Sequence, residues 1–163
     1  MAVDYSFRKN RLVGFYDAGD EFWEGLEDGV FRLSRCAGCD RWNWEAFNGS
    51  PTFRCGECGS WDLNWVEVDP EGVVYAWIRT NQPFDGVLER KDEIPYVSVE
   101  TEIGGPGGPR VMGVLKGSAD GLRVGAKVRG SIDPPSPKTK GYASVRWELA
   151  ENDDPTKHEG DGR

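Results

Sequence analysis

The sequence predicts a mainly β protein in which a short N-terminal helix and a small cysteine-rich module precede a five-stranded barrel. Three observations support this fold class. Four cysteines stand in two Cys-x-x-Cys pairs, 22 glycines and 10 prolines occur among 163 residues, and the second half alternates apolar with polar residues. Paired cysteines at this spacing indicate a metal-binding ribbon. Abundant glycine and proline favour turns over long helices, and alternation of period two indicates strands.

A short helix is expected soon after residue 17. Asp17 is a helix-capping residue, and acidic residues follow it in the first turn, where they interact favourably with the helix dipole. Gly29 provides the stop. One face of this helix carries the apolar residues Phe22, Trp23 and Leu26. That face could pack on its own domain, but a small ribbon offers little core, so Phe22 and Trp23 are candidate contacts with a partner chain.

The four cysteines define the first candidate site. Cys36 and Cys39 form one pair, Cys55 and Cys58 form the other, and fifteen residues separate the pairs. This spacing is typical of a zinc ribbon, in which two facing turns direct four thiolates at one tetrahedral metal ion. A cage with four protein ligands leaves no open position, so it stabilises a fold but cannot activate water. We therefore expect a structural zinc ion, with iron as the alternative metal.

Two other uses of the cysteines compete with metal binding. Four cysteines in a secreted domain can form two disulfides. The opening residues MAVDYSFRKNRLVGF lack the apolar region of a signal peptide, and no apolar run is long enough to span a bilayer. A single Cys-x-x-Cys can be a redox pair, which two pairs at ribbon spacing disfavour. We expect a cytoplasmic protein that does not enter a membrane.

The ribbon is unusually rich in aromatic residues. Its strands are expected at Val30–Arg35 and Trp61–Val68. Trp61 and Trp65 lie in the second of these, and the segment between the cysteine pairs adds Trp42, Trp44 and Phe47. A ribbon has too small a core to bury so many rings, and exposed aromatic clusters mark interaction surfaces. Some rings could instead cover the metal turns, but we expect at least two to meet a partner chain, and Trp42, Trp44 and Phe47 are the candidates.

The C-terminal half predicts a small barrel. The expected strands are Gly72–Asn81, Tyr96–Ile103, Val111–Leu115, Lys127–Ile132 and Ala143–Leu149. Five short strands in about 80 residues are typical of an OB-fold, with an SH3-like barrel as the alternative. The expected segments are an arm with the helix (1–29), the ribbon (30–70), the barrel (71–150) and a disordered acidic tail (151–163).

Two loops of the barrel offer candidate contacts with a ligand or a partner. The loop 82–95 is long and apolar at its tip, a feature of functional loops and of loops folded over a barrel end alike. The loop 133–141 contains three prolines and is expected to be extended and stiff. The candidate residues are Phe84 and Leu88 in the first loop and Lys138 and Lys140 in the second.

Composition limits the possible functions. The net charge is −8, which disfavours nucleic-acid binding because that affinity rests on neutralising phosphates with Lys and Arg. The single histidine, His158, lies in the polar tail. No Ser-His-Asp or Cys-His arrangement can therefore form in the body of the protein. An enzyme built on this chain would have to rely on Asp, Glu, Lys or Tyr.

Residues 17–150 resemble a known family with an N-terminal helix, a rubredoxin-like zinc ribbon and a C-terminal OB-fold, long labelled a domain of unknown function and encoded beside thiolases. The similarity rests on the Phe22-Trp23 helix, the Cys55-Gly-Glu-Cys58-Gly-Ser motif, and the turn Gly121-Leu122-Arg123-Val124-Gly125. The resemblance implies an accessory subunit without catalytic residues. Its partner would be a thiolase-like or lipid-transfer-like enzyme acting on acyl-CoA thioesters, including retro-aldol cleavage of steroid side-chain CoA esters.

The resemblance further implies a heterotetramer with two copies of each chain, in which this chain could help to hold the CoA or acyl group. One departure stands out: residues 41–46, RWNWEA, replace a proline-rich F-P-P-R stretch common in the family, which suggests a specialised partner or substrate. The alternatives are a single-stranded nucleic-acid-binding protein, an independent CoA-thioester enzyme using a carboxylate base, and an electron carrier with an iron-loaded cage.

Overall fold

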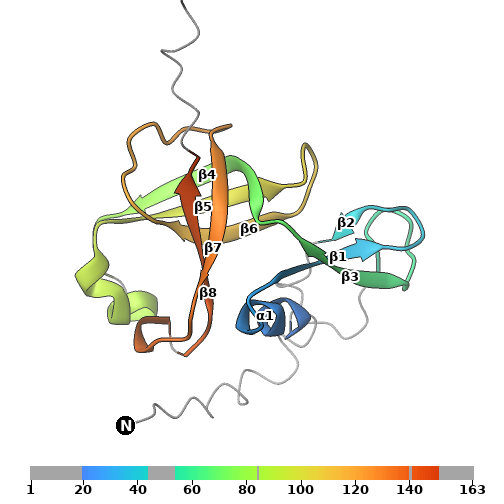
Figure 1. Ribbon diagram of the computed structural model, residues 1–163, viewed down its shortest axis with the longest axis horizontal. Helices are drawn as coiled ribbons and strands as arrows, with labels where there is room; N and C mark the ends of the chain where they lie inside the picture. Colours follow the sequence, from blue (N-terminus) through green and yellow to red (C-terminus); the bar gives the residue numbers. More distant parts are fainter. Residues whose placement is uncertain (1–19, 44–53, 84, 140, 151–163) are drawn as a thin grey trace, which may run out of the picture.

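The computed structural model describes residues 20–43, 54–83, 85–139 and 141–150, and it confirms the predicted fold class (Figure 1). A short helix, a three-stranded sheet and a closed five-stranded barrel follow one another along the chain. The elements are α1 (Asp20–Glu27), β1 (Phe31–Cys36), β2 (Trp42–Asn43), β3 (Leu63–Val68), β4 (Glu71–Thr80), η3 (Asp85–Glu93), β5 (Tyr96–Ile103), β6 (Arg110–Leu115), β7 (Lys127–Asp133), η4 (Pro137–Thr139) and β8 (Ser144–Leu149). No helix in these ranges is long and apolar enough to cross a membrane.

Helix α1 ends where the sequence predicts. Gly29 adopts a left-handed conformation with φ of 83°, which glycine reaches without steric cost. The N–H of Val30 donates to the carbonyl of Gly25, and the N–H of Gly29 donates to that of Leu26. This pair of bonds is a Schellman motif. It turns the chain from α1 directly into β1, while the predicted cap, Asp17, lies outside the described residues.

The ribbon is a small antiparallel sheet with the order β2-β1-β3. Strand β1 pairs with β3 along its whole length, from Phe31 opposite Val68 to Cys36 opposite Leu63. Because this register brings the end of β1 to the start of β3, the first cysteine pair meets the second at one end of the sheet. The other end of the sheet leads through Asp69 and Pro70 into the barrel.

The barrel closes in the order β4-β5-β6-β8-β7. All its pairs are antiparallel except β6 with β8, which run parallel with Val114 opposite Arg146. A five-stranded Greek-key barrel is the arrangement of an OB-fold, so the leading prediction holds over the SH3-like alternative. On β5 the predicted inward face, Val97, Val99, Thr101 and Ile103, is buried and alternates with partly exposed residues.

Trp147 on β8 occupies the centre of the hydrophobic core. Its side chain is fully buried, and its ring lies 6.1 Å from that of Phe31 on the ribbon strand β1. Two glycines on the strands that flank β8 make room for this indole. A Cβ at Gly113 on β6 or at Gly130 on β7 would come within 2.8 Å of Trp147. The same core cluster includes Phe22 and Leu26 of α1, so helix, ribbon and barrel share one core.

The two long loops of the barrel are tied together by Glu93, at the end of η3. Its carboxylate accepts a hydrogen bond of 2.7 Å from Arg90 and lies 3.3 Å from Nζ of Lys138 and 3.7 Å from Arg146. The prolines of the loop 133–141 predicted an extended segment, and this prediction is wrong for part of the loop. Residues Pro137–Thr139 form a 3-10 turn, because the Thr139 hydroxyl donates to the carbonyl of Tyr142 at 2.6 Å and folds the loop back on itself.

We expect the substitution Gly130→Ala to destabilise the protein by roughly 1–3 kcal/mol, the usual cost of overpacking a core. The added methyl would meet the Trp147 ring at 2.8 Å and Cβ of Pro70 at 2.9 Å. Chemical denaturation of purified protein measures the effect. Gly56→Ala is the matched control, since a Cβ there would meet nothing within 4 Å. Equal stability of the two variants would contradict the packing account.

Glu93 makes stability depend on acid pH. Partial burial acts to raise the pKa of its carboxyl, but hydrogen bonding and charge from Arg90, together with Lys138 and Arg146, outweigh it and hold the pKa below the ordinary 4.5. Because the folded-state pKa is lowered, this stabilisation is present above the unfolded pKa and is lost as pH falls through the folded pKa.

We therefore expect Glu93→Gln to lower the melting temperature at pH 7, by an amount equivalent to roughly 1–3 kcal/mol for a broken, mostly buried charged hydrogen bond. The difference from the unaltered protein should shrink between pH 5 and pH 3. Calorimetry across this range provides the measurement, with exposed Glu148→Gln on β8 as the control. A difference that stays constant with pH would show that the Glu93 charge is not responsible.

Candidate functional site

The four cysteines converge on one point. Their sulfur atoms all lie within 4.8 Å of one another, and Sγ of Cys36 lies 3.5 Å from that of Cys58, as does Sγ of Cys39 from that of Cys55. Metal–sulfur bonds of about 2.3 Å in a tetrahedron place the sulfurs about 3.8 Å apart. The observed separations fit such a cage, and they are far longer than the S–S bond of a disulfide. The cluster could therefore hold a metal ion.

The two cysteine turns have the same backbone geometry. In the first, the N–H of Cys36 donates to the carbonyl of Arg41, and Asp40 donates back to Cys36. In the second, Cys55 donates to Ser60, and Gly59 donates back to Cys55. Asp40 and Gly59 occupy equivalent left-handed positions, with φ of 66° and 71°. The spacing of the cysteines thus encodes one turn used twice.

Each turn buries its first sulfur and exposes its second. Cys36 and Cys55 are buried, whereas Cys39 and Cys58 are exposed. Backbone hydrogen bonds from Cys58 and Glu57 lower the pKa of Cys55 to about 6. At Cys39 a backbone hydrogen bond from Arg41 acts to lower the pKa, but desolvation and the three other cysteines raise it to about 12. Amide N–H groups directed at sulfur favour thiolates, the form that binds metals.

The predicted partner-contact residues divide into three groups. Phe22 is only 4% exposed, so its ring belongs to the chain's own core. Trp23 remains half-buried, with its ring 5.1 Å from that of Phe22 and 6.1 Å from that of Tyr142. Trp42 is also half-buried, beneath the guanidinium of Arg35 at 5.1 Å. Trp44 and Phe47 lie outside the described residues.

Among the described aromatic residues of the ribbon, Trp61 has the greatest exposure; the sequence places it among the possible contacts but not among the named candidates. It is 54% exposed, and the Arg54 guanidinium lies 4.2 Å from its ring centre. Trp65, by contrast, packs against the core. Position relative to the cysteines could not distinguish these tryptophans, because their exposure depends on tertiary packing: Trp65 lies on β3 against the core, whereas Trp61 precedes this strand.

The predicted substrate contacts that the structure describes lie on two loops that meet at Glu93. Leu88 is 48% exposed on η3. Lys138 forms an ion pair with Glu93 at 3.3 Å, so its charge already has a partner. Phe84 and Lys140 lie outside the described residues. No sequence signal pointed to the cluster of Arg90, Glu93 and Arg146, because its members are up to 56 positions apart along the chain.

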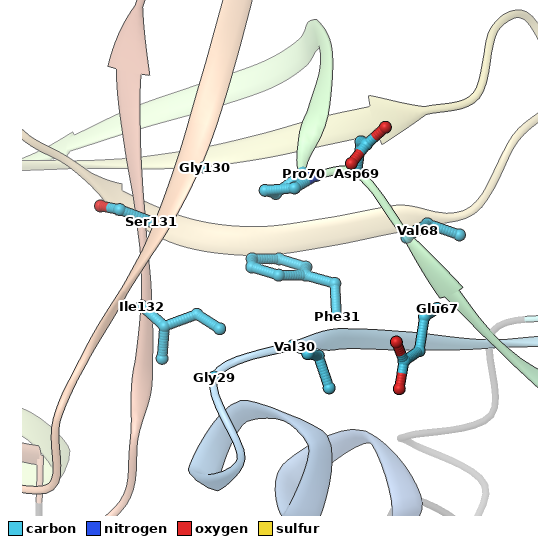
Figure 2. A pocket seen from close by; sticks show the side chains of 10 residues that line it. All are labelled: Gly29, Val30, Phe31, Glu67, Val68, Asp69, Pro70, Gly130, Ser131 and Ile132. Carbon is cyan, nitrogen blue, oxygen red and sulfur yellow. The ribbon is translucent and has the colours of Figure 1, made fainter.

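A cavity of about 530 Å³ lies at the junction of ribbon and barrel (Figure 2). Its wall is apolar where Phe31, Pro70 and Ile132 face it, and the carboxylates of Glu67 and Asp69 lie on its ribbon side. Glu67 is paired with Arg32 at 3.6 Å. Gly29 and Gly130 also line the cavity. A Cβ at Gly29 would meet nothing within 4 Å, whereas one at Gly130 would meet Trp147 and Pro70.

Comparison with known proteins shows which proteins this architecture resembles. Residues 65–133 match the family model described as the C-terminal OB-fold domain of ChsH2. Among solved structures, the chain is similar to one described as the Ltp2-ChsH2(DUF35) aldolase, with 23% sequence identity and a TM-score of 0.64 over 82% of this chain and 94% of the other.

A second similar structure is a DUF35-family protein of unknown function from Sulfolobus solfataricus. It has 19% identity and a TM-score of 0.53, over 90% of this chain and 93% of the other. A search of the curated proteins found no match. The resemblance inferred from the helix, the cysteine motif and the barrel strands is therefore confirmed: residues 65–133 match the OB-fold domain of ChsH2, and the chain shares the fold of DUF35 proteins.

Proposed function

We propose that this chain is a non-catalytic accessory subunit of a thiolase-like or lipid-transfer-like enzyme that acts on acyl-CoA thioesters. The observation that carries the proposal is the match of the barrel to ChsH2, together with a shared fold with a protein named as part of an Ltp2-ChsH2 aldolase. The word aldolase in that name denotes cleavage of a carbon–carbon bond, and the acyl-CoA ester as substrate is what the family resemblance implies. The cysteine cluster and the distribution of aromatic residues are consistent with an accessory role.

Zinc is the metal that best suits the cluster. Four thiolates in a tetrahedral arrangement, two of them buried, are the donor set of a structural zinc site. Because all four positions would be filled by protein, the ion would supply folding free energy and no catalytic chemistry. The ion would join the first turn, through Cys36 and Cys39, to the second turn, through Cys55 and Cys58. This link would stabilise the small sheet β2-β1-β3.

The partner-facing surface would be the ribbon and helix side of the molecule. Trp23 and Trp42 are half-buried and retain accessible ring surface, as expected of aromatic residues at interfaces. Trp44 and Phe47 would extend this surface from the segment between the cysteine pairs. The arrangement we propose has two copies of this chain on a dimeric enzyme, with the catalytic residues in the partner and the acyl-CoA held close to this chain.

The metal assignment predicts that Cys55→Ser will unfold the ribbon. Structural zinc contributes an apparent ~10–16 kcal/mol to the folding of small zinc domains, more than this small sheet can lose. Inductively coupled plasma mass spectrometry should find one zinc per unaltered chain and none in the variant, which should also fail to bind the partner. Glu57→Gln is the control, since it keeps all four sulfurs and breaks only an exposed ion pair with Arg41. Iron in the purified protein would refute zinc, and a variant that still pairs with its partner would refute the structural role.

The accessory role is tested by purifying the tagged chain from its native host and identifying what co-elutes by mass spectrometry. A stoichiometric thiolase-like or lipid-transfer-like subunit is the expected result. Recovery of the chain alone, or turnover of an acyl-CoA by the isolated chain, would reject the proposal.

Within that complex, Trp23→Ala should weaken partner binding by about 2 kcal/mol, or roughly 30-fold, as expected for an interfacial tryptophan. Ile78→Ala is the control, because Ile78 is 66% exposed on the barrel strand β4 and lies off the helix and ribbon. Biolayer interferometry with the purified partner compares the two variants. Equal effects of the two substitutions would place the interface elsewhere.

A further inference from the structure

One end of the barrel brings basic and acidic side chains together around two loops. Four cationic side chains gather around the loops 81–95 and 134–143, while the chain as a whole has a net charge of −8. The cations are Arg79, Arg90, Lys138 and Arg146, and the carboxylates among them are Glu93 and Asp133. The loop 81–95 also contains Asp85, Glu89 and Asp92, so this end of the barrel is not basic as a whole. The excess of positive charge is confined to the cavity, whose charged lining residues are Arg79, Arg146 and Glu93. These loops connect β4 to β5 and β7 to β8, and the corresponding loops of OB-folds frame the ligand-binding face.

A cavity of about 410 Å³ opens at this end of the barrel. Its walls come from the end of β4, the start of β5, the end of β6 with the following turn, and Arg146 of β8. The volume lies at the lower end of the range for small-molecule sites. The residues that line it include Arg79, Arg146 and Glu93, together with Gly117, Ser118 and Ala119 of the turn after β6.

The two arginines of the cavity differ in whether their guanidinium groups already have partners. Arg146 is held in place, since its Nε donates to Asp133 at 2.6 Å and its side chain is only 18% exposed. Arg79 is exposed, and among the residues that the structure describes no hydrogen bond or ion pair engages its guanidinium. Glu93 does not cancel this charge, because Arg90, Lys138 and Arg146 already share its carboxylate.

The turn after β6 adds backbone donors. Gly117 adopts a left-handed conformation with φ of 83°. The backbone N–H groups of Gly117, Ser118 and Ala119 donate to no other group of the described chain. The one acidic residue of this turn, Asp120, is tied to the Ser118 hydroxyl at 2.8 Å. Successive N–H groups in such a turn form a concavity that binds anions.

We infer that this cavity is a binding site for the phosphate or diphosphate group of a small ligand, with Arg79 as the principal cation and the Gly117–Ala119 turn as a backbone cradle. Arginine suits this role because its planar fork can donate two hydrogen bonds to one phosphate group. The inference rests on the charges and the cavity, and it deepens the proposed function: if the proposed partner's substrate is an acyl-CoA, this site would take its phosphates.

The test uses the full zinc-loaded chain without a partner, so its result is independent of complex formation. Isothermal titration calorimetry with inorganic pyrophosphate should detect binding that Arg79→Glu weakens at least tenfold. Arg129→Glu is the matched control, because Arg129 is exposed, pairs with Glu71 and does not line this cavity. It makes the same change in net charge and should alter affinity less than twofold. Melting temperatures of both variants verify folding.

Two further arms distinguish the source of the phosphate. Coenzyme A binding more tightly than ADP would identify the acyl-CoA cofactor, and equal binding would indicate a general diphosphate site. Amide chemical shifts of residues 117–119 should move on titration and stay fixed in Arg79→Glu. The inference is overturned if millimolar pyrophosphate, ADP and coenzyme A all fail to bind, if Arg129→Glu weakens binding as much as Arg79→Glu, or if only a single-stranded oligonucleotide binds.

Discussion

The burial of Trp147 between two glycine-containing strands is the constraint on which the rest of the fold depends. The indole takes the space that side chains at Gly113 and Gly130 would need, so the strands on both sides of β8 can approach it. Its contact with Phe31 then joins the barrel to the ribbon, and through Phe22 and Leu26 of the same cluster to the helix. A ribbon and a short helix that bury little apolar surface alone thereby gain the core of a larger domain.

This shared core gives the ribbon a fixed position on the barrel, while the four cysteines gather at its far end. Strands β1 and β3 meet the core at Phe31 and Val68 and reach the cysteines at Cys36 and Leu63. One end of the sheet is thus held by apolar packing and the other by the four sulfurs. A partner enzyme that contacts the helix and ribbon would meet a preformed surface, which lowers the entropic cost of association.

Charge is distributed unevenly over the same scaffold. The cavity at the junction has carboxylates on its ribbon side, whereas the loops at the end of the barrel concentrate arginine and lysine around Glu93. Two arginines that line one cavity of an acidic protein favour the binding of anionic ligands there over the rest of the surface. The salt network therefore serves two purposes, because the carboxylate that ties the loops together also orders the cations at the cavity.

The sequence by itself determined the parts of this protein that depend on local spacing. The sequence predicts the cysteine pairs, the helix end at Gly29 and the strand Tyr96–Ile103, because each of these patterns involves residues only a few positions apart. Tertiary structure alone decided that Phe22 joins the core and that Glu93 gathers Lys138 and Arg146. These outcomes depend on contacts between segments tens of residues apart, and barrel closure, which no local pattern encodes, brings those segments together.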